Sequence, residues 1–143
     1  MTLINTTNNP IRVALFNYVD FDVGQSAGGD SAILVNPQLM RITDAGGDFA
    51  EFLAVGANAW EVQAWPVLIN ALNDASVTNL SNTGLPFGPG DFTGAFQWNL
   101  SIPVGGSVTV FEGLAINMEA VPAPGVLALL GLGGLLAMRR RRG

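Results

Sequence analysis

Residues 11–23 read Ile-Arg-Val-Ala-Leu-Phe-Asn-Tyr-Val-Asp-Phe-Asp-Val, and every second position from Ile11 onward is apolar except Asn17. A repeat of two residues is typical of a strand with one buried face, because successive side chains point to opposite sides of a sheet. This segment therefore predicts a half-buried β-strand.

The sequence that follows continues as short strand-like runs. Val, Ile and aromatic residues recur over residues 31–35, 39–43, 49–55 and 59–65, between Gly-Gly, Asn-Pro and Gly-Ala-Asn breaks. Runs at this spacing are typical of an antiparallel sandwich. Residues 65–74 predict one short helix that crosses one end of the sheets, with Pro66 in its first turn. The predicted fold is therefore all-β: an antiparallel β-sandwich domain over residues 1–119, with one short helix.

Two further alternating runs cover residues 92–102 and 107–117. A turn at residues 103–106 separates them, so they are expected to pair as a hairpin. Glu112 interrupts the apolar stripe of the second run, which indicates a bulge or an edge strand. Before the hairpin, residues 84–91 are rich in proline and glycine and predict a loop.

The composition excludes several kinds of chemistry. The 143 residues include neither cysteine nor histidine. A thiolate nucleophile, an imidazole base and a zinc site of the usual nitrogen and sulfur ligands are therefore excluded.

The charge of the chain is unevenly placed. Four of the six arginines lie at residues 139–142, and the rest of the chain has two arginines against eleven acids, a formal charge of −9. Two isolated arginines cannot supply the phosphate contacts that nucleic acid needs, so no nucleic-acid partner is expected. Because the basic cluster directly follows an apolar run, it favours a membrane-topology role.

The C-terminal residues 120–143 form a separate segment. Residues 126–138 carry no charged or hydrogen-bonding side chain. A helix of this length spans about 20 Å, less than the roughly 30 Å of a bilayer core, but local thinning and snorkelling arginines compensate. A transmembrane helix over residues 126–138 is therefore expected. The arginines mark its cytoplasmic end, which leaves the body outside the cytoplasm.

This C-terminal segment resembles the PEP-CTERM sorting signal of Gram-negative bacteria. The resemblance rests on a proline motif, the apolar segment and a basic end, in that order: Val121, Pro122, Ala123, Pro124 and Gly125, then residues 126–138, then Arg139, Arg140, Arg141 and Arg142. It implies that exosortase, a protease of the inner membrane, processes the chain and sends it to the cell surface or the exterior, in bacteria that make exopolysaccharide and biofilm. Ala123 stands where the family usually has glutamate, and the alternative outcome is a protein retained in the membrane.

The N-terminal residues 1–10 have neither the basic region nor the apolar core of a signal peptide. Since export requires such a signal, we expect the sequence to be a C-terminal fragment whose start lies upstream. The alternative is insertion by the terminal helix alone.

Asp20, Asp22 and Asp30 are candidate ligands for calcium, because their oxygens suit a hard cation. The spacing departs from the EF-hand pattern, with glycine fifth in place of sixth and Ser31 in the twelfth place. An exposed strand end before a hairpin loop explains the same residues, and the sequence favours that interpretation.

We therefore expect a non-enzymatic exported surface or extracellular-matrix protein. One alternative is a carbohydrate-binding module for exopolysaccharide, in which tryptophans stack on sugar rings; the candidates are Trp60, Trp65 and Trp98, although core positions are commoner for them. Another alternative is a glycoside hydrolase that uses paired carboxylates, with Asp44, Asp48 and Glu51 as candidates. A solvated loop and strand face is the favoured interpretation of these three acids.

Overall fold

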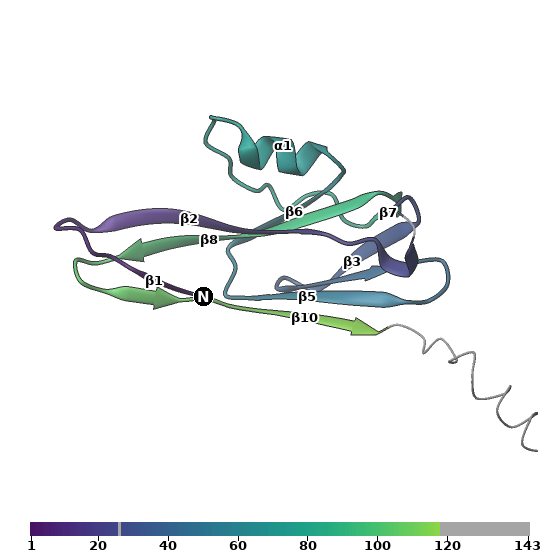
Figure 1. The fold of residues 1–143 in the computed structure, drawn as a ribbon, viewed down its shortest axis with the longest axis horizontal. Helices are drawn as coiled ribbons and strands as arrows, with labels where there is room; N and C mark the ends of the chain where they lie inside the picture. Colours follow the sequence, from purple (N-terminus) through teal and green to yellow (C-terminus); the bar gives the residue numbers. More distant parts are fainter. Residues whose placement is uncertain (26, 118–143) are drawn as a thin grey trace, which may run out of the picture.

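The computed structural model describes residues 1–25 and 27–117 (Figure 1). The expected sorting motif, transmembrane helix and arginine cluster of residues 121–142 lie outside this part of the chain. Across the residues that are described, no helix has the length and apolar character needed to span a bilayer.

Strands form most of the described chain, together with one α-helix and one 3-10 turn. In chain order they are β1 (Thr2–Ile4), β2 (Ile11–Asp20), the turn η1 (Val23–Gln25), β3 (Asp30–Asn36), β4 (Leu39–Thr43), β5 (Phe49–Val55), β6 (Ala59–Ala64), α1 (Val67–Asn73), β7 (Phe87–Gly90), β8 (Phe92–Ile102), β9 (Ser107–Thr109) and β10 (Phe111–Asn117). The predicted all-β body with one short helix is confirmed, and the strands that alternation marked have nearly the predicted bounds.

The strands form two main antiparallel sheets and one small one. The larger sheet has the order β10-β5-β4-β3-β7, the smaller has the order β2-β8-β6, and β1 pairs with β9. The two main sheets lie one above the other with the core between them (Figure 1). Phe52 of β5 meets Phe96 of β8 across this core, with ring centroids 5.0 Å apart. Alternation along each strand therefore places one side of each main sheet in a shared apolar interior.

The helix α1 covers the outer face of the three-stranded sheet and does not cross one end of the sheets, as the sequence had suggested (Figure 1). Leu68 of α1 packs in one cluster with Ala95 of β8 and with Leu80, which lies in the segment between α1 and β7. As a result β8 is buried on both faces. Its polar Gln97 is 1% exposed, and the side-chain oxygen of Gln97 accepts a hydrogen bond from the Leu80 N–H at 2.7 Å.

The predicted hairpin between residues 92–102 and 107–117 is wrong. Both edges of β8 are already occupied, by β2 and β6, so the next residues cannot pair with it. The chain instead divides at the buried Val110: β9 pairs with β1, and β10 joins the edge of the larger sheet beside β5.

The loop predicted over residues 84–91 also needs correction, because Phe87–Gly90 forms the edge strand β7 beside β3. An edge position tolerates Pro89, which has no N–H to donate to a neighbouring strand.

The two polar residues that interrupt predicted apolar stripes contact each other. Asn17 of β2 donates a hydrogen bond through Nδ2 to Oε2 of Glu112 in β10. Both residues lie on edge strands, one in each main sheet. Glu112 therefore marks an edge strand, one of the two outcomes expected, and the pair links the sheets along this side.

Candidate functional site

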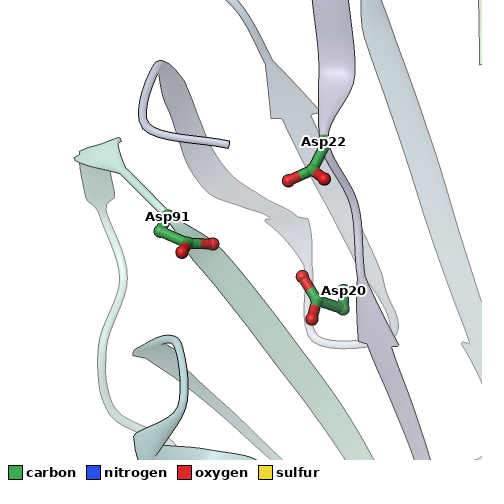
Figure 2. Close-up of side chains that lie close together, drawn as sticks. All are labelled: Asp20, Asp22 and Asp91. Atoms are coloured by element: carbon green, nitrogen blue, oxygen red, sulfur yellow. The ribbon is translucent and has the colours of Figure 1, made fainter. Parts of the chain in front are cut away.

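Three aspartates gather at one end of the three-stranded sheet, and we call Asp20, Asp22 and Asp91 the acidic cluster (Figure 2). One carboxylate oxygen from each lies within 4.8 Å of the others. Asp20 and Asp22 are exposed and Asp91 is half-buried. Among the described residues, no other group of three or more acidic side chains comes together in this way.

The pairing of β2 with β8 explains why the cluster forms. Asp20 lies opposite Thr93 in this antiparallel pair, and Asp91 stands two residues before Thr93. Asp91 directly precedes β8 and Asp22 lies two residues beyond the end of β2, so the β2–β8 pairing brings all three aspartates together at this end of the sheet. Spacing alone identified Asp20 and Asp22, but Asp91 is too distant in sequence to be found without the strand register.

Asp30, the third residue in the expected calcium set, lies elsewhere. It begins β3 opposite Gly90, the residue before Asp91, and its side chain is fully buried. Neither carboxylate oxygen has a hydrogen-bond partner within the described residues. The pKa of Asp30 is raised to about 6, mainly by burial; the Val23 backbone N–H lowers it, and the charges of Asp22, Asp44 and Asp91 also raise it.

Within the acidic cluster, the pKa of Asp20 is raised. Burial is the main cause of the raised pKa of Asp20, followed by the charges of Asp22 and Asp91. The Tyr18 hydroxyl donates to Oδ2 of Asp20 at 3.4 Å. The pKa of Tyr18 is raised as well, first by burial and then by the Asp20 charge.

No arginine compensates this negative charge in the described chain. Arg41 makes an ion pair with Glu51 at 2.5 Å and lies over the ring of Phe49. Arg12 lies near the start of β2, about 26 Å from Asp20 along an extended strand. The cluster is therefore a concentrated negative charge with no basic side chain beside it.

The other candidate acids do not converge. Glu51 faces Arg41 across the β4–β5 pair. Asp44 accepts a hydrogen bond from the Asp48 N–H at 2.9 Å within the turn between these strands. The described chain therefore does not bring Asp44, Asp48 and Glu51 together as a group.

The three tryptophans occupy different environments. Trp98 is 2% exposed, and its Nε1 donates to the Val55 carbonyl at 2.9 Å, so it belongs to the core. Trp60 is half-buried against the same core. Trp65 is 54% exposed, and its backbone N–H donates to the Asp91 carbonyl at 3.0 Å.

Family models, curated proteins and solved structures were compared with the chain, and none of them matches it. The chemistry of its own residues is therefore the basis for the functional proposals below.

Proposed function

We propose that the chain is a non-enzymatic exported protein of the cell surface or extracellular matrix, sorted through residues 120–143. The observation that carries the proposal is the order of a proline motif, an apolar segment and four arginines after the folded body. The last described strand, β10, ends at Asn117, four positions before Val121. The signal therefore follows the body almost directly.

The proposed mechanism depends on partitioning and charge. Residues 126–138 enter the inner membrane because they carry no polar side chain, and Arg139 to Arg142 stop translocation at the cytoplasmic face. Pro122 and Pro124 favour an extended backbone, the form in which a protease such as exosortase takes a substrate. The acidic body is then released, or displayed if processing at Ala123 fails.

A paired-proline experiment tests the sorting role. The chain, expressed behind a secretion leader in an exosortase-bearing host, should be processed to a mature form without the arginine cluster. Replacing Pro122 and Pro124 with alanine should remove most of this product, because the motif loses its extended bias. Intact-mass spectrometry of surface and membrane fractions measures the outcome.

Pro37→Ala with Pro103→Ala is the matched control, since both prolines are exposed in the folded body. Equal processing of all three chains, or equal processing in a host without exosortase, would contradict the proposal.

Carbohydrate binding is a second candidate function, favoured by the exposure of Trp65. Trp65 is 54% exposed, so its indole can offer a flat apolar face to a sugar ring, whereas the indoles of Trp60 and Trp98 pack on the core. Exopolysaccharide is the proposed ligand, consistent with a place at the cell surface.

Retention on immobilised exopolysaccharide tests this second candidate. Trp65→Ala should abolish most of the retention, and Trp65→Phe should keep part of it, because phenylalanine still stacks. Val67→Ala is the control, since Val67 is equally exposed two residues away. Retention that survives Trp65→Ala would exclude Trp65 as the binding residue.

A further inference from the structure

We propose that the free edge of β10 pairs with β10 of a second copy of the chain, antiparallel and about a two-fold axis at Leu114. The larger sheets of the two copies then join into one continuous sheet. This inference does not depend on the sorting function, because it rests on a strand of the folded body.

The backbone of β10 pairs with β5 on one side and leaves the other side free. The Ala54 N–H of β5 donates to the Gln38 carbonyl at 2.8 Å, away from β10. Opposite residues of an antiparallel pair either exchange two hydrogen bonds or make none, so Glu112, opposite Ala54, turns its N–H and C=O to the free edge. Leu114 and Ile116 follow by alternation. Within the described residues no strand lies on this side of β10, so these groups are available to one.

The core is open along the same edge. Leu114 and Ile116 lie opposite Phe52 and Ala50, which are both buried in the core. Leu114 is nevertheless 54% exposed, and Ile116 is 59% exposed. Figure 1 shows β10 running along the border of the molecule from the N-terminus. A further strand beside β10 therefore also brings apolar side chains against Leu114 and Ile116.

The two edges of the larger sheet differ in their protection. The strand at the opposite edge, β7, has four residues and includes Pro89, and both features discourage pairing with another chain. The strand β10 has seven residues, with neither proline nor lysine and with Glu112 as its one charged residue. A longer, largely apolar edge of this kind is a template for pairing.

The length of the free edge fits a second copy of β10. Met1 occupies the edge as far as Val110: its ammonium donates to the Val110 carbonyl, and its carbonyl accepts the Val110 N–H, both at 2.9 Å. The free stretch is therefore Phe111–Asn117, which is β10 itself. A second β10 fills it over its full length without displacing Met1.

This length also defines the register. Antiparallel pairing over the whole strand places Leu114 opposite Leu114 of the second copy, and Glu112 opposite Ile116 of the second copy. The two Glu112 residues, which are the charged residues of the two strands, lie about 14 Å apart, so like charges do not meet. The two leucines and two isoleucines lie on the same face and form one apolar group on the core side.

Disulfide trapping tests this register, because the chain has no cysteine of its own. Leu114→Cys in the full chain, in non-ionic detergent, should form a linked dimer on mild oxidation, since the two Cα atoms of this pair lie about 5.5 Å apart. Ile116→Cys is the matched control on the same face, with similar exposure. Its copy lies about 14 Å away, beyond the roughly 7 Å that a disulfide spans. Non-reducing electrophoresis should show on the order of tenfold more dimer for Leu114→Cys.

A charge at the axis gives a second readout that needs no cysteine. Leu114→Lys places two ammonium groups opposite each other and should lower the dimer fraction about tenfold in sedimentation velocity. Val77→Lys adds the same charge at a residue that is 93% exposed and should leave the dimer fraction unchanged. Tryptophan fluorescence checks that both variants remain folded.

Four results would overturn the proposal. The first is equal trapping of Leu114→Cys and Ile116→Cys, and the second is no trapping of either. The third is an unsubstituted chain that stays monomeric in sedimentation. The fourth is a dimer fraction that Leu114→Lys and Val77→Lys change equally, which would place the contact between copies away from β10.

Discussion

In the absence of divalent cations, the free energy of unfolding is expected to fall by about 2 to 3 kcal/mol between pH 4 and pH 7, and Asp30→Asn is expected to remove most of this fall. The cause is the pKa of Asp30, which the fold raises from 3.8 to about 6. A raised pKa means that the folded protein holds this proton more tightly than the unfolded chain. The resulting stabilisation is complete below pH 4 and is lost as the pH rises through 6.

Urea unfolding at pH 4, 5, 6 and 7, followed by tryptophan fluorescence, measures this dependence. The groups that act on Asp30 are Asp22, Asp44 and Asp91. Asp20 also has a raised pKa, so a small fall should remain in the Asp30→Asn variant. Asp74→Asn is the control, because Asp74 is exposed at the end of α1. A pH dependence unchanged by Asp30→Asn would show that the buried carboxylate is not its source.

The strands could be predicted because a two-residue repeat is a local signal. The runs at residues 39–43 and 49–55 match β4 and β5, and no distant contact is needed to recognise them. Pairing is different, because it depends on which edges other strands have already taken. The β1–β9 pair joins Thr2 to Thr109, and the residues between 92 and 117 hold no signal for it.

The two-residue repeat also cannot show whether a polar residue on the outer face of a strand is exposed to water or is covered by another helix or loop. Gln97 lies on the polar side of β8, yet α1 and the segment after it cover this side. Its amide remains paired there, with Leu80, Asn79 and Asn99, so burial carries little penalty.

The candidate site could be predicted only where its residues are neighbours in sequence. Asp20 and Asp22 are two apart in the strand predicted over residues 11–23, so the spacing alone places them on one face, although β2 itself ends at Asp20. Asp91 joins them through the β2–β8 register, which the sequence does not specify. Asp30 falls on the same side of β3 as the buried Ala32, a position that a strand end before a glycine-rich turn did not reveal.

Gly88→Ala is expected to reduce the free energy of unfolding by more than about 3 kcal/mol, because two costs add at this position. Gly88 has φ +95°, in the region that side chains rarely adopt. An added Cβ would also lie 2.2 Å from the backbone oxygen of Asp30 and 2.7 Å from the Cα of Ser31. Neither backbone atom can move without separating β7 from β3.

Gly47→Ala separates the two costs, because Gly47 also has φ +95° but has no atom within 4 Å of the added Cβ. This variant should lose only the conformational part, about 1 to 2 kcal/mol. Urea unfolding of both variants measures the difference, which is the contribution of the close approach between β7 and β3. Equal losses of stability in the two variants would mean that this close approach does not hold β7, and with it Asp91, in place.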